Sequence, residues 1–177
     1  SGTTKMATFN NLTIGSQILT LTGGNSYGLA FEGATTLLGN AYFNNSTDVV
    51  LGGASGAAGT GSIATDGGAI IFNKNNTGTL WIHSANPGLA ANVYVNAGLL
   101  AFGTRAVGNV NANLGAGDIF VNPGAQIQVR GMGNINTALG QEVKLTGTQY
   151  AAAIMRTTFS ATQAQLQSLI QATTPGV

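Results

Sequence analysis

The chain has 177 residues, and only 6% of them are charged, against roughly 25% in an ordinary soluble domain. The formal net charge is +1, and no cluster of Lys and Arg marks a surface for nucleic acid or anionic membrane. The absence of cysteine excludes disulfides, thiol nucleophiles and thiolate metal sites. The apolar stretches are too short for a membrane span, whereas 44% hydrophobic residues suffice to bury a core.

The N-terminal stretch is polar and leads directly into a strand-like segment. Residues 1–11 show no capping pattern, and Leu12, Ile14 and Ile18 begin an apolar alternation. Either the native chain continues upstream or another subunit covers this end, which motivates the hypothesis of head-to-tail stacking or exchange of terminal strands. The cysteine-free, Thr/Asn/Gly-rich composition favours an extracellular or cell-surface location.

The middle of the chain repeats one strand, corner and strand pattern. Residues 93–100 and 119–126 both read apolar, any residue, apolar, Asn, small, Gly, and then resume a strand. Residues 63–70 form a weaker copy, with Asp66 in the place of Asn96 and Asn122. Asn, Asp and Gly accept the positive φ angles that tight corners require. The Gly-rich residues 52–59 read as an excursion between such units, since no phosphate-loop lysine follows.

These short units predict a stacked β fold. Each unit exposes an apolar face that it cannot bury alone, so the units must stack, and strands about 4.8 Å apart give a parallel β-solenoid. An antiparallel sandwich with frequent glycine turns is the alternative, but it explains the repeated corner less well. We expect Asp66, Asn96 and Asn122 to form a polar ladder along one edge. The positions expected to point inward are Leu12, Ile14, Ile63, Ile70, Val93, Val95, Leu99, Ile119, Val121, Ile127 and Val129.

Two aromatic residues occupy matching places in neighbouring units. Tyr94 and Phe120 each lie between two apolar positions that should point inward. They are therefore expected side by side on an outer face, as a candidate interaction surface for a glycan or a partner protein. Packing under a loop or under the C-terminal tail is the alternative.

The same segments resemble a known family. Residues 78–82 (GTLWI), 93–99 (VYVNAGL), 114–119 (LGAGDI) and 123–125 (PGA) are similar to the autotransporter-associated β-strand repeat of bacterial surface proteins, over roughly residues 61–131. The resemblance implies a right-handed β-helix that is displayed outside the cell and often serves adhesion, scaffolding or presentation.

The pattern changes near residue 148. Residues 149–156 include an alanine run, and Ser160 to Gln163 form a capping-box signature ahead of Leu166, Leu169 and Ile170. The sequence thus predicts two units, a β-solenoid over residues 1–147 and a helical cap or tail over residues 148–177. One or two amphipathic helices would cover the end of the solenoid or pack along its flank.

Residues able to carry out chemistry are few and scattered. His83 lies on an apparent strand without a nucleophile elbow, and no two acids share a segment suited to glycoside hydrolysis. Calcium and zinc spacings are missing, so we expect no catalytic residues, no metal and no cofactor. An enzyme acting on polysaccharides remains a less favoured reading, and it would have to use Asp66, Asp118 or Arg130.

The leading functional hypothesis is a non-enzymatic extracellular structural or adhesive β-solenoid. Its expected partners are further copies in a homo-oligomer or head-to-tail polymer, a glycan, or a host or surface protein. Low charge leaves little repulsion between copies. A glycan- or ice-binding module is the alternative, with residues 20–22, 77–79 and 146–148 as threonine pairs that could order water.

Overall fold

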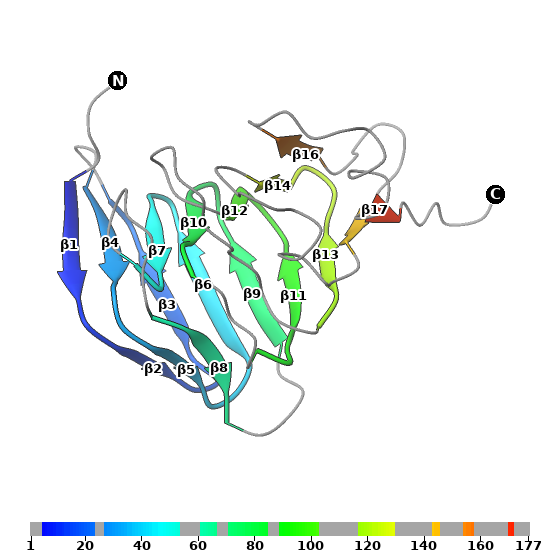
Figure 1. The fold of residues 1–177 in the computed structure, drawn as a ribbon. Coiled ribbons are helices and arrows are strands. Elements are labelled where there is room, and N and C mark those ends of the chain that lie inside the picture. Colours follow the sequence, from blue (N-terminus) through cyan, green and yellow to red (C-terminus); the bar gives the residue numbers. More distant parts are fainter. Residues whose placement is uncertain are drawn as a thin grey trace.

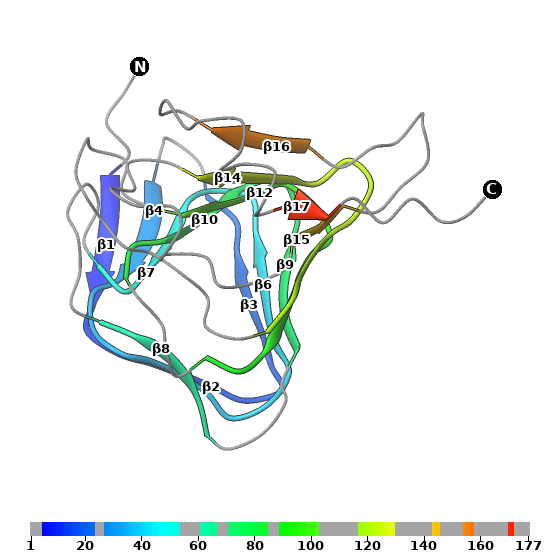
Figure 2. The same cartoon turned by 45° about the vertical axis from the view of Figure 1, so that its right-hand side comes forward.

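The computed structural model describes residues 5–23, 27–53, 61–66, 71–84, 89–102, 117–129, 143–145, 154–157 and 170–171. It is a right-handed parallel β-solenoid, in which the chain passes through the same sheets coil after coil (Figures 1 and 2). The predicted solenoid is confirmed, because every strand lies parallel to its neighbours rather than antiparallel as in a sandwich. Within the described ranges, no helical segment is long and apolar enough to cross a membrane.

Three sheets form the walls of the solenoid (Figure 2). The first sheet has the order β1 (Lys5–Phe9), β4 (Tyr27–Phe31), β7 (Val49–Leu51), β10 (Thr79–Ile82), β12 (Leu99–Phe102), β14 (Gln126–Val129) and β16 (Ile154–Thr157). The second sheet has the order β3 (Ile18–Leu21), β6 (Ala41–Asn45), β9 (Ile71–Asn75), β11 (Asn92–Val95), β13 (Ile119–Val121), β15 (Val143–Leu145) and β17 (Ile170–Gln171). The third sheet has the order β2 (Leu12–Ile14), β5 (Thr35–Leu37) and β8 (Ile63–Thr65).

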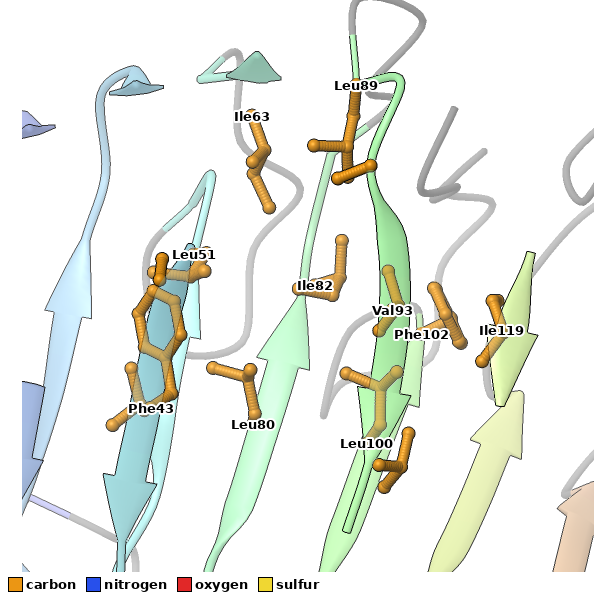
Figure 3. Packing of buried hydrophobic residues seen from close by; sticks show 14 of the residues in the cluster. Phe43, Leu51, Ile63, Leu80, Ile82, Leu89, Val93, Leu100, Phe102 and Ile119 are labelled. Atoms are coloured by element: carbon orange, nitrogen blue, oxygen red, sulfur yellow. The ribbon is translucent and has the colours of Figure 1, made fainter. Parts of the chain in front are cut away.

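The core fills the space between the sheets (Figure 3). Alternate residues of each strand point inward, and the parallel register places the same parity in every coil, so Leu80 stacks against Val49 and Leu100. Most inward side chains are fully buried, each removing apolar surface worth about 1.5–3 kcal/mol. The predicted inward residues that lie buried in this core are Ile14, Ile63, Val93, Val95, Ile119, Val121 and Ile127.

The other predicted inward positions behave differently. Leu12 is half-buried and packs against the core, because it belongs to the first coil. The prediction for Leu99 is wrong: it packs on the outer side of the first sheet, against a cluster that contains Trp81 and Ala101. Ile70 lies outside the described residues, and only the backbone of Val129 is described.

The error at Leu99 has its origin in the corner. Val93 pairs with Ile119, 26 residues later, whereas Leu99 pairs with Gln126, 27 residues later. The second copy of the repeat therefore has one more residue in its corner, Ala125, which is buried. An extra residue moves every following side chain to the other face of the strand.

The described part of the tail also differs from the prediction, because it contains strands and not helices. Residues 154–157 form β16, which pairs with β14, and residues 170–171 form β17, which pairs with β15. A helix is the wrong prediction for these two segments, because the free edges of both sheets offer unpaired backbone groups that a further strand satisfies. The capping-box residues and the rest of residues 148–177 lie outside the described residues.

Candidate functional surface

A ladder of asparagine amides runs along the outer side of the second sheet. Asn96 Nδ2 donates to Asn75 Oδ1 (2.9 Å), and Asn122 Nδ2 donates to Asn96 Oδ1 (2.7 Å). The register places Asn44 next to Asn75, and Thr20 next to Asn44, in the same column. Both bonds run in the same direction, because in each the amide of the later coil donates to the amide of the coil before it. The ladder thus joins three coils and gives the stack a direction.

Asp66 does not belong to this ladder. It follows β8 in the third sheet, and its backbone N donates to Leu37 O (3.1 Å). The predicted ladder is wrong at this residue because β8, the strand before Asp66, lies in the third sheet, whereas β11 and β13, the strands before Asn96 and Asn122, lie in the second. Asn75 was not predicted from the sequence to belong to the ladder. Lys74 pairs with Val95 in neighbouring strands, and this register places Asn75 beside Asn96.

Tyr94 and Phe120 stack on one another beside the amide ladder. Their register is direct, the ring centroids are 4.8 Å apart and the planes are inclined by 8°. Lys144 continues the column, with its Nζ 5.1 Å from the Phe120 centroid. The facing sides of the two rings are therefore covered by each other, and the far side of Phe120 lies under a cation. Both faces of Phe120 are thus in contact, while Tyr94 has one face covered by Phe120.

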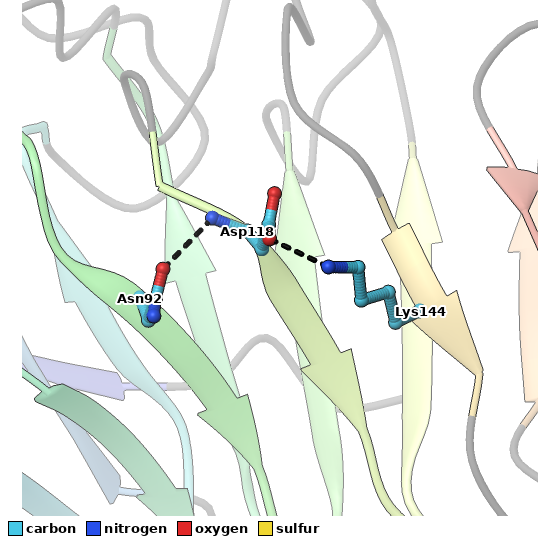
Figure 4. Close-up of polar contacts among 3 residues, drawn as sticks. All are labelled: Asn92, Asp118 and Lys144. Atoms are coloured by element: carbon cyan, nitrogen blue, oxygen red, sulfur yellow. Dashed lines mark hydrogen bonds and ion pairs between the residues drawn. The ribbon is translucent and has the colours of Figure 1, made fainter. Parts of the chain in front are cut away.

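Asp118 connects its own coil with the coils before and after it (Figure 4). Its backbone N donates to Asn92 Oδ1 (3.1 Å), and Lys144 Nζ donates to its carboxylate Oδ2 (2.7 Å). The ion pair is partly exposed, so its contribution to stability is on the order of 0.5 kcal/mol. Its geometric effect is to hold Lys144 over the ring of Phe120.

Lys74 is an inward cation. It stands between Phe43 and Val95 in a column that is otherwise apolar, and its side chain is 0% exposed. Its Nζ donates to Asn75 O (2.6 Å), Asn76 O (2.6 Å) and Ala97 O (3.3 Å). Burial disfavours the ammonium and lowers the pKa of Lys74 from 10.5 to about 8. The side chain thus closes the corner after β9 from the inside and ties it to the following coil.

Asn45 closes a neighbouring corner in the same way. Its buried Nδ2 donates to Thr47 O (2.6 Å) in the same corner and to Thr79 O (3.0 Å). Thr79 begins β10, which belongs to the following coil. Two inward polar side chains, Asn45 and Lys74, therefore satisfy backbone carbonyls at the turns that lead out of the second sheet.

The residues considered for catalysis do not converge. His83 is buried and lies edge-on to Trp81, with ring centroids 6.0 Å apart, while Asp66 follows a strand of the third sheet and Asp118 precedes a strand of the second. Arg130 lies outside the described residues. Among the residues that the structure describes, no three His, Asp or Glu side chains gather as metal ligands would.

The first coil exposes side chains that later coils bury. Phe9 is 55% exposed, whereas Phe31, directly above it in the same inward column, is 7% exposed. Leu19 is half-buried, and Phe43 above it is fully buried. We call the inward-pointing residues of the first coil that are exposed or half-buried the end face: Ala7, Phe9, Leu12, Leu19 and Leu21.

Comparison with known proteins identifies no relative of this chain. The chain matches no protein-family model, and neither a curated protein nor a solved structure is significantly similar to it. Function must therefore be argued from the ladders, the corners and the end face.

Proposed function

We propose that this chain is a non-enzymatic structural or adhesive β-solenoid that works outside the cell and assembles into a fibre or surface layer. The observation that carries the proposal is how the polar side chains of the second sheet are used. Asn96 and Asn122 bond to each other, and Lys144 bonds to Asp118, so both pairs join successive coils. Side chains in these positions strengthen the stack along its axis, as amide ladders do in cross-β assemblies.

Composition supports the assignment to an extracellular setting. The chain has no cysteine, few charges and many Gly, Thr and Asn residues, and its repeat resembles the autotransporter-associated β-strand repeat of passenger domains. A β-solenoid with little net charge suits a scaffold that contacts further copies, because its surface opposes association only weakly.

A glycan- or ice-binding module is less well supported. Tyr94 and Phe120 each cover one face of the other, and Lys144 covers the second face of Phe120, which leaves little aromatic face on which a sugar ring could stack. Thr20 lies in the second sheet and Thr79 in the first, so these two members of the threonine pairs do not share one flat array.

Electron microscopy of the purified chain, with light scattering on the same sample, tests the proposed function. We expect filaments or sheets of uniform width and a scattering mass that rises with protein concentration. A monodisperse monomer over the micromolar range, with no assembled species on the grid, would contradict the assembly that we propose. A polysaccharide turnover abolished by changing Asp118 would instead establish an enzyme.

A further inference from the structure

We propose that the end face is the docking surface for a second copy of this chain, whose β16 and β17 stack on β1 and β3 in a head-to-tail contact. The inference rests on the proposed function and identifies the surface through which assembly occurs. It also gives the assembly a polarity, because each copy would contribute one end of its first and second sheets to the junction.

The first argument is burial. Inward side chains in the interior coils are covered on both sides by the coils before and after them, whereas the end face has a coil on one side only among the described residues. Phe9 packs against Phe31, with ring centroids 5.8 Å apart, and leaves more than half of its surface exposed to solvent. A second copy that covers these five side chains would bury apolar surface, and each Å² buried stabilises the contact by about 25 cal/mol.

The second argument is the absence of protection at this edge. Proteins block free strand edges with charged residues and proline, since an open edge pairs with another chain. The first coil, residues 5–21, contains one charged residue, Lys5, and no proline. β1 and β3 each end a sheet in the described structure, so one side of each strand has backbone groups that can accept a further parallel strand.

The third argument is matching geometry. At the other end of the same two sheets lie β16 and β17, which run parallel to β1 and β3. A second copy placed head to tail continues both sheets with the pairing that joins every internal coil. A head-to-head contact would instead place antiparallel pairs at the junction and interrupt the direction of the amide ladder.

The size of the end face sets the expected strength. A stable protein interface uses about 20–30 residues from each side. The first coil offers 17 residues, from Lys5 to Leu21. We therefore expect an association that depends on protein concentration rather than a permanent complex.

A cysteine pair tests the contact directly. Thr8 begins the column of register partners in the first sheet that ends at Arg156, so a head-to-tail junction brings these two positions next to each other. Neighbouring parallel strands lie about 4.8 Å apart, within the Cα separation of a disulfide. The chain has no native cysteine to interfere.

We expect the Thr8→Cys/Arg156→Cys chain to form a ladder of covalent multimers under mild oxidation that reduction abolishes. The control Thr13→Cys/Arg156→Cys places the first cysteine in the same coil but on the third sheet, and it should stay largely monomeric. Wild-type filaments without this ladder would overturn the head-to-tail contact and leave the proposed function standing. A wild-type monomer without the ladder would overturn both, and covalent dimers of the single Thr8→Cys chain would establish head-to-head pairing.

A second pair of variants tests the apolar surface itself. Phe9→Asp places a charge in the end face, whereas Leu38→Asp places one at an equally exposed leucine (54%) in a lateral corner of the second coil. We expect Phe9→Asp to raise the concentration needed for assembly at least tenfold and Leu38→Asp to leave it unchanged. Circular dichroism checks that both chains are folded, and equal effects of the two variants would overturn the proposal.

Discussion

At the scale of single residues, the solenoid uses polar side chains to bind one coil to the next. Outside, the amides of Asn75, Asn96 and Asn122 form a continuous chain. Inside, Lys74 donates to three backbone carbonyls that come from two successive corners. Backbone groups at a corner have no sheet partner, so a buried donor that reaches them replaces the hydrogen bonds of a strand.

Lys74 leads to a prediction about pH. Its pKa is about 8 in the folded chain and 10.5 in the unfolded reference, so between these values the unfolded chain binds more protons. The free energy of unfolding should therefore rise as the pH increases from 8 toward 10.5, by on the order of 1–2 kcal/mol after allowing for water near the group. Below pH 8 both states are protonated and this contribution is lost.

Denaturant titrations at pH 7.5, 8.5 and 9.5 measure this dependence. Lys74→Met keeps a long side chain in the apolar column but removes the titrating group, so the difference between the two chains isolates Lys74 from other ionisable groups. Parallel pH profiles of wild type and variant would show that Lys74 does not carry the effect.

At the scale of elements, the corners determine how the coils are aligned. Gly98 and Gly124 both have positive φ, 69° and 79°, which glycine adopts without strain. Their surroundings differ: a Cβ at Gly98 would collide with the carbonyl oxygens of Asn76 and Gly78, whereas a Cβ at Gly124 would meet nothing within 4 Å. The extra residue in the second corner lifts Gly124 away from the coil before it.

The two glycines therefore form a matched pair. Gly124→Ala should cost about 1 kcal/mol, from the positive φ alone. Gly98→Ala should cost distinctly more, about 2–4 kcal/mol, because the methyl group also displaces the adjacent corner. Chemical denaturation of both variants measures the difference. Equal losses would mean that the close approach at Gly98 does not constrain the stack.

The features predicted correctly from the sequence are those that follow from the face of a strand on which each residue lies. Tyr94 and Phe120 are neighbours as expected, because both precede an unchanged Val-Asn corner. Asp66 failed because spacing along the chain does not say which wall of a solenoid a corner belongs to. Leu99 failed because Leu99 to Phe102 are all apolar, so alternation could not identify the inward face.

Two further features depend on packing that sequence patterns do not contain. Lys74 stands at an inward position only because three carbonyl groups from two corners converge there. Residues 154–157 include helix-favouring residues, yet the open edge of β14 takes them up as a strand. Tertiary pairing overrides local propensity in short segments of this kind.

At the scale of the whole molecule, two seven-stranded parallel sheets share one direction and end in unlike edges. One end carries the exposed side chains of the first coil, and the other carries β16 and β17. An object of this kind that pairs with itself through its ends forms an open, polar filament rather than a closed ring, provided that the junction adds no large rotation. Assembly would then extend the same hydrogen-bond ladder that holds each chain together.

X-ray fibre diffraction from aligned filaments tests this account most directly. If copies join end to end, the solenoid axis lies along the filament, and the reflection from strand spacing, near 4.8 Å, should lie on the fibre axis. Filaments built by lateral contact between solenoids would place that reflection away from the axis. The second result would contradict the claim that this protein assembles through its ends.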